Sequence, residues 1–256
     1  MPRESVYSAL ILKSRALNFA GANQESNREV WLLTGDAGIM QATVFGGVKS
    51  KLRAHTAPFH SGKIWIYHNP VKDSRKVSDF DVHSWRPGLR ELYDRALAAA
   101  AIADTILASH GGGGNWPAAL KFAEEILDAL EDSNEEQCIR VLIYFFWKWA
   151  EFLGLQPQLE YCCGCRKPAD FSRALWYSPR EGEVFCPSCA QGNQAGRSAM
   201  LSLGPGCRRW LAAVQPLAPC RLGYFSMDNK SMGEAKAFTS ALIAAAIGKR
   251  PASWDW

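Results

Sequence analysis

The sequence VWLLTGDAGIMQATVF, residues 30–45, predicts a β-hairpin and with it the fold of the N-terminal part of the chain. Two runs of β-forming residues, 30–33 and 39–45, flank a turn rich in glycine and aspartate, which is typical of a hairpin. In the second run apolar and polar residues alternate, and this alternation indicates a strand with one buried face.

Further short strands are expected on both sides of this hairpin, at 6–12, 64–68 and 76–82. Five short strands in so short a segment favour a small closed barrel, because closure leaves no unpaired strand edge. We therefore expect a β-barrel domain over residues 1–82.

The spacing of apolar residues changes after Arg86 to steps of three and four, which predicts amphipathic helices. The helix expected at 134–153 is apolar nearly all round, so it should lie at the centre of a bundle. An α-helical domain is therefore expected over 83–256, with a cysteine-rich insert at 155–195, and the chain is of the α+β multidomain class. The other helices are expected at 87–107, 116–130, 206–216 and 233–248.

Two Cys-x-x-Cys motifs, Cys162 to Cys165 and Cys186 to Cys189, are separated by 20 residues. Each motif can place two thiolates on one side of a metal ion, and the spacing is typical of a tetrahedral zinc site. Four thiolates leave zinc no open position, so one structural Zn²⁺ per chain is expected. Unconnected thiols and a thioredoxin-like redox pair are the alternatives, and Cys163 could replace Cys162 as a ligand.

The composition is that of a globular protein, with 48% hydrophobic and 21% charged residues among 256. No apolar run is long enough to span a membrane, and we see no secretion signal at the N-terminus. We therefore expect a cytoplasmic protein without membrane contact. In a reducing compartment, clustered cysteines more often bind metal than form disulfides.

The net charge of +4 is unevenly distributed. Residues 1–80 contain 11 Lys and Arg against 6 Asp and Glu, whereas residues 81–256 contain 18 against 19. A basic excess in one domain is compatible with a polyanionic partner, and equally with an ordinary solvated surface.

Basic residues near the expected barrel loops are the candidates for contact with nucleic acid: Lys13, Arg15, Lys49, Lys51 and Arg53. Aromatic residues are interleaved with them, as in single-strand binders that combine a basic groove with stacking platforms. The same aromatics could instead fill the barrel core, since a small barrel needs large side chains. They are Trp31, Phe45, Phe59, Trp65 and Tyr67.

No motif predicts a catalytic site. The glycine run 111–114 lacks the Lys-Ser/Thr of a phosphate-binding loop, and we expect it to link two helices. The five histidines form no metal-binding pattern, and no Gly-x-Ser-x-Gly is present. We therefore expect a protein that is not an enzyme.

The segment FLGLQPQLEYCCGC, residues 152–165, resembles the junction between helix and zinc site in the RecO family of bacterial recombination mediators. The hairpin turn at 32–38 and the basic loop at 45–51 are similar to those of the same family, as are Pro58-Phe59 and the stretch 248–253. The resemblance covers most of the chain, whereas residues 217–232 match no feature of the family.

This resemblance implies an OB-fold followed by an α-helical domain with a zinc finger. It also implies binding to single- and double-stranded DNA, annealing of complementary strands, and partnership with RecR and single-stranded-DNA-binding protein (SSB) in loading RecA. The five basic residues named above would then contact phosphate, in a cytoplasmic, nucleoid-associated protein.

Two other interpretations stay open at this point. The basic domain could dock an acidic peptide, such as the tail of SSB, without binding DNA. A sirtuin-like deacylase could carry a structural zinc at similar spacing, although the glycine motif of a dinucleotide site is missing.

Overall fold

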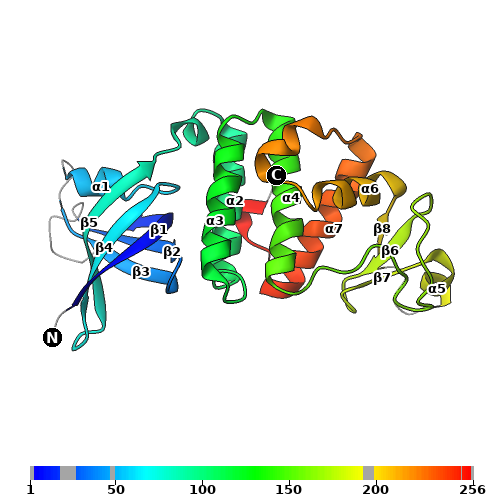
Figure 1. Cartoon of the computed structure of the whole chain (residues 1–256), viewed down its shortest axis with the longest axis horizontal. Coiled ribbons are helices and arrows are strands. Elements are labelled where there is room, and N and C mark those ends of the chain that lie inside the picture. The colour runs from blue at the N-terminus through cyan, green and yellow to red at the C-terminus, as the bar shows by residue number, and fades with distance from the viewer. Residues whose placement is uncertain (1–2, 18–26, 47–49, 193–198, 249, 255–256) are drawn as a thin grey trace. The chain divides into compact units, whose positions relative to one another are not determined.

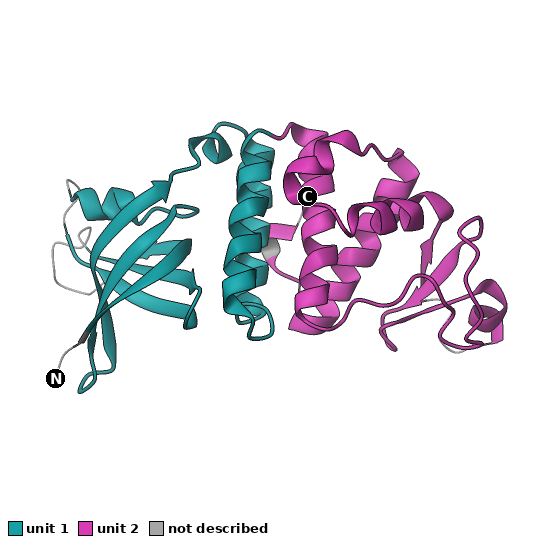
Figure 2. Cartoon of the chain, in the orientation of Figure 1, with its two compact units in different colours: residues 1–132 teal, residues 133–256 magenta. Residues whose placement is uncertain are grey.

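The structure is a computed structural model that describes residues 3–17, 27–46, 50–192, 199–248 and 250–254. The chain divides into two compact units, residues 1–132 and 133–256 (Figure 2). Within the described residues, no helix combines the length and apolar character that a membrane crossing requires.

The first unit begins with a closed five-stranded barrel of strand order β1-β2-β3-β5-β4 (Figure 1). Strand β1 pairs antiparallel with β2 and β4, and the pairs β2–β3 and β4–β5 are also antiparallel. A parallel contact between Thr43 and Lys76 joins β3 to β5 and closes the barrel. Closure satisfies both edges of the sheet. This confirms the small closed barrel expected from the strand pattern and the OB-fold that the family resemblance implied. The elements are β1 (Arg3–Ala16), β2 (Arg28–Thr34), β3 (Gly38–Val44), α1 (Lys51–His55), β4 (Ser61–Asn69) and β5 (Ser74–Ser84).

The barrel core is built from aliphatic side chains. Alternate residues of each strand point inward, and Phe80 is the one aromatic member of this buried cluster among the described residues. The five aromatics that the sequence could also have placed in the core are absent from it. The buried cluster is Ala9, Ile11, Val30, Leu32, Met40, Ala42, Val44, Ile64, Ile66, Val77 and Phe80.

Two long helices, α2 (Tyr93–Ala108) and α3 (Trp116–Glu131), belong to the same unit as the barrel. Trp116 packs over the hairpin turn at Gly38, where a Cβ atom would lie 2.6 Å from the indole ring. Gly38 also has a φ of 66°, so both the close approach and the backbone favour glycine. The expected helix from residue 87 begins instead as a short 3₁₀ turn, η1 (Pro87–Arg90).

Arg86 connects the end of the barrel to α3. Its side chain is buried, and its Nε lies 2.6 Å from Asp128 Oδ1. Its Nη1 donates to the carbonyl of Phe59 at 2.8 Å and to Ser61 Oγ at 3.0 Å. The domain boundary that we expected after residue 82 stays a prediction. Packing places the first two long helices in one compact unit with the barrel.

The second unit is centred on α4 (Glu135–Phe152), whose side chains are buried nearly all round, as its sequence predicted. A capping box starts this helix, since Asn134 and Gln137 each accept from the other's backbone N–H. Helix α7 packs against α4 and against α6. The remaining helical elements are α6 (Pro205–Val214), η3 (Pro219–Tyr224), α7 (Asn229–Ile247) and η4 (Ala252–Trp254).

Between α4 and α6 lies a small sheet of order β7-β6-β8 with a short helix, α5 (Pro187–Gly192). Its strands are β6 (Leu175–Ser178), β7 (Glu183–Phe185) and β8 (Leu201–Leu203). Because β8 pairs with β6, the sheet continues beyond residue 195, where we expected the insert to end. This small layer carries the cysteine cluster.

Candidate metal centre and nucleic-acid interface

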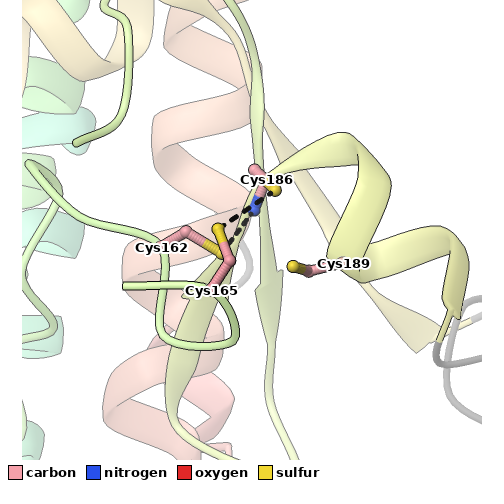
Figure 3. A group of neighbouring side chains, drawn as sticks. All are labelled: Cys162, Cys165, Cys186 and Cys189. Atoms are coloured by element: carbon pink, nitrogen blue, oxygen red, sulfur yellow. Dashed lines mark hydrogen bonds between the residues drawn. The ribbon is translucent and has the colours of Figure 1, made fainter. Parts of the chain in front are cut away.

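The four cysteines of the two Cys-x-x-Cys motifs come together in space. The Sγ atoms of Cys162, Cys165, Cys186 and Cys189 all lie within 4.8 Å of one another. In Figure 3 the four side chains point toward a common centre, two from the loop after α4 and two from the end of β7 and from α5. Ligands about 2.3 Å from a tetrahedral zinc would have sulfurs roughly 3.8 Å apart, so the donor set could hold such an ion.

Local backbone bonds hold the first motif as a tight knuckle. The N–H of Cys162 donates to the carbonyl of Lys167 at 3.0 Å, and the N–H of Arg166 donates back to the carbonyl of Cys162 at 2.9 Å. Gly164 sits inside the knuckle, where an added Cβ would lie 3.1 Å from the Sγ of Cys189. The glycine therefore lets the two motifs approach closely.

Hydrogen bonds among the cysteines lower the pKa of one thiol and raise that of another. Burial alone would raise the pKa of Cys162, but donors at Cys165 and Cys186 bring it down to about 6. One of them is the backbone N–H of Cys186, 3.2 Å from the Cys162 sulfur. The same sulfurs raise the pKa of Cys189 to about 12. A dication would remove the remaining protons, because metal binding requires thiolates.

The other cysteines stay outside this cluster. Cys163 is next to a ligand candidate in sequence, yet its thiol is not among the four grouped sulfurs. Burial, followed by the charge of Glu183, raises the pKa of Cys163. Cys162 is therefore the first-motif ligand that the geometry favours. Cys138 and Cys207 are buried, and Cys220 is exposed.

The candidate DNA-contacting cations separate into two groups. Lys13 and Arg15 lie on the outer face of β1, and both form ion pairs. Lys13 Nζ is 3.4 Å from Asp104, and Arg15 Nη2 is 2.7 Å from Glu29. Lys51 and Arg53 lie on α1 instead. Lys49 is outside the described residues.

Aromatic rings lie beside the cations of the outer barrel face. The Arg15 guanidinium is 5.3 Å from the Trp31 ring centroid, and Lys76 Nζ is 5.3 Å from that of Phe45. Trp31 is half-buried and Phe45 is 48% exposed. We call these four residues, together with Lys13, the outer platform.

The strand register places these side chains in neighbouring rows. Lys13 is opposite Trp31, and Arg15 is opposite Glu29, which pairs with Thr43 and through it with Lys76. Lys76 was not among the candidates named from sequence. It is an exposed residue next to the buried Val77 in β5, and this alternation could have suggested that it faces solvent. The pairing of β3 with β5 that brings it to Phe45 cannot be read from the sequence.

The comparisons with known proteins agree with this architecture. Residues 90–255 match the family model described as Recombination protein O C terminal. The match covers well over half of the chain. This chain belongs to the RecO family.

Two curated relatives also carry the RecO name. DNA repair protein RecO of Maridesulfovibrio salexigens is 24% identical over 205 residues, 78% of this chain and 79% of the relative. DNA repair protein RecO of Rubrobacter xylanophilus is 29% identical over 169 residues, 64% of this chain and 65% of the relative. Helices α2 to α7 and the four grouped cysteines all fall within the residues that match the family's C-terminal model.

Proposed function

We propose that this chain is a non-enzymatic DNA repair and recombination mediator. On this proposal it binds single- and double-stranded DNA, anneals complementary strands, and helps to load RecA onto DNA coated with SSB. Its partners would include RecR and the acidic tail of SSB, and it would act in the cytoplasm at the nucleoid. Membership of the RecO family and the names of its two relatives as DNA repair proteins support this assignment.

The observation that carries DNA binding is the outer platform. The half-buried ring of Trp31 and the exposed ring of Phe45, each next to a cation on the outside of a closed barrel, combine base stacking with phosphate attraction. The ion pairs of Lys13 and Arg15 do not oppose this use, because exposed pairs are weak and exchange readily for phosphate. Residues 1–82 would be the DNA-binding domain.

We also propose that Cys162, Cys165, Cys186 and Cys189 hold one Zn²⁺. A set of four thiolates is typical of zinc in structural sites, and it would leave no coordination position for a substrate. The cluster lies on a small core of its own, which includes Phe185, Ala190 and Met200. Zinc would therefore stabilise the segment 155–195 rather than perform chemistry.

Fluorescence anisotropy of a labelled single-stranded oligonucleotide, measured at three salt concentrations, tests DNA binding. Wild type should bind tightly at low salt, and the variant with Trp31→Ala and Phe45→Ala should bind at least tenfold more weakly, since each stacked base is worth about 1–3 kcal/mol. Tyr224→Ala, which removes an exposed ring in the second unit, is the matched control. No binding of wild type at low salt would refute DNA binding and favour the acidic-peptide scaffold.

A further inference from the structure

A second exposed aromatic ring lies at the other end of strand β5. Trp85 directly follows β5 and is 44% exposed. Lys76 of the outer platform is near the start of the same strand, nine residues earlier. At about 3.3 Å per residue, up to roughly 30 Å of strand separates the two positions. Trp85 is therefore not part of the outer platform.

Two histidines pack against the Trp85 ring. The ring packs edge-on against His55, with centroids 5.2 Å apart and an interplanar angle of 89°, and against His60 at 4.9 Å and 64°. His55 Nδ1 lies 3.0 Å from the carbonyl oxygen of Phe80, and His60 Nδ1 lies 2.9 Å from that of His55. The two imidazoles are thus fixed by the backbone, and they fix the indole in turn.

The backbone around Trp85 is also held in place. Phe59 has a φ of 72° and Arg86 a φ of 44°, conformations that non-glycine residues rarely adopt. The Arg86 guanidinium donates to the Phe59 carbonyl and to Asp128. These bonds hold the segment around Arg86 against the segment around Phe59 and against helix α3. A ring held in this way loses little freedom when it binds a flat ligand.

Three cations lie on the same elements as the two histidines or in contact with them. Arg90 is exposed, and its Nη2 reaches the carbonyl of Pro58 at 2.9 Å and His60 Nε2 at 3.3 Å. Lys51 and Arg53 lie on α1, the helix that also carries His55. In the described part of the chain, neither Lys51 nor Arg90 is within ion-pair distance of a carboxylate. The nearby carboxylates of Asp128 and Glu131 bind the Arg86 side chain and the backbone N–H of Gly88.

We propose that Trp85 with His55, Lys51, Arg53 and Arg90 forms a second single-strand binding site on the barrel, in which the indole stacks on a base and the cations contact phosphates. An exposed aromatic face flanked by cations is the combination that single-stranded nucleic acid selects, because every base offers a π-face and every linkage a negative charge. The proposal rests on the proposed DNA-binding function and adds a site to it. One barrel would then hold two separate strand segments.

Fluorine NMR on protein labelled with 5-fluorotryptophan tests this site directly. The resonances of Trp31 and Trp85, among the ten tryptophans, are assigned with Trp31→Phe and Trp85→Phe. Titration with an oligothymidylate of about five nucleotides, near the smallest OB-fold site size, should shift both resonances. If the Trp31 resonance shifts and that of Trp85 stays fixed to saturation, the second site is wrong while DNA binding stands. If neither shifts, DNA binding by the barrel fails as well.

Affinity measurements give an independent readout. Trp85→Ala should weaken binding of a 16-nucleotide strand roughly tenfold, whereas Trp85→Phe should retain most of the affinity, because a phenyl ring still stacks. Tyr224→Ala is again the control. Trp85→Phe keeps a ring against both histidines, so it guards against loss through misfolding. Equal affinities of wild type and Trp85→Ala for the 16-nucleotide strand would overturn the proposal.

Discussion

The Arg208 guanidinium donates to the carbonyl oxygen of Leu159 at 2.8 Å, and so ties helix α6 to the segment that precedes the first cysteine motif. Arg208 is fully buried. It also donates to the carbonyls of Asp170 and Arg173 at 2.7 and 2.8 Å, beyond that motif. One side chain therefore holds both ends of the loop that carries Cys162 and Cys165.

Replacing Arg208 should destabilise the second unit. Arg208→Met removes hydrogen bonds from a charged donor, each worth about 1.5–3 kcal/mol, and leaves buried carbonyls without partners. We expect the free energy of unfolding to fall by about 3 kcal/mol or more in urea denaturation followed by circular dichroism. Arg209→Met, at the exposed neighbouring position, is the control. Equal stability of Arg208→Met and wild type would contradict this role.

Metal content should depend on the grouped cysteines and not on their neighbour. Purified wild type should contain about one zinc per chain, and Cys186→Ser should lose it and unfold the small sheet, because metal binding contributes to the folding of such sites. Cys163→Ser is a close control, since Cys163 is adjacent to Cys162 but outside the cluster. Atomic emission measures the zinc. Full metal content in Cys186→Ser, or its loss in Cys163→Ser, would refute the ligand assignment.

Salt dependence should report the number of phosphate contacts. If each of the five basic residues named from sequence contacts one phosphate, the slope of log affinity against log salt should be about −3.5 for single strands. The loss of two of these contacts should reduce the magnitude of the slope by about 1.4. We expect this reduction in the variant Lys51→Glu with Arg53→Glu. The matched variant Arg180→Glu with Lys230→Glu makes the same charge change at exposed sites of the second unit. The same loss of slope in both variants would mean that net charge, and not these sites, governs binding.

The stability of the first unit should fall in mild acid because of His60. Its Nδ1 faces the His55 carbonyl and its Nε2 faces Arg90, an arrangement that suits the neutral ring. Burial, together with the charges of Arg90 and Arg86, holds the pKa of His60 below 6.5. As the pH drops below about 6.5, the unfolded chain therefore takes up the proton first, and the free energy of unfolding decreases. The loss should level off below the folded-state pKa.

Urea denaturation between pH 7.5 and pH 5 measures this effect. His60→Gln should lose part of the pH dependence, because an amide can donate and accept without titrating. The control is His110→Asn at an exposed position with a φ of 51°, which asparagine tolerates. Identical pH profiles for wild type and His60→Gln would show that His60 is not responsible.

The sequence by itself determined the elements and the grouping of the four cysteines. Strand alternation and helical spacing are local signals, so the barrel strands, the long helices and the buried α4 all lie where their patterns predicted. The two Cys-x-x-Cys motifs were equally readable, because each motif brings two thiols together within a few residues. The sequence did not predict the boundary between the 3₁₀ turn η1 and helix α2. This boundary follows Arg86, whose contacts are with residues far away in the chain.

Only the tertiary structure decided which side chains enter the barrel core and which distant residues they contact. Barrel closure selected aliphatic residues for the core and left Trp31 and Phe45 outside it. The same closure brought Lys76 to Phe45. The fold placed Lys13 and Arg15 on β1 but Lys51 and Arg53 on α1. Arg208 reaches its carbonyl partners across more than thirty residues. Such pairings depend on strand register and helix packing, which join positions far apart in the chain, and no local pattern encodes them.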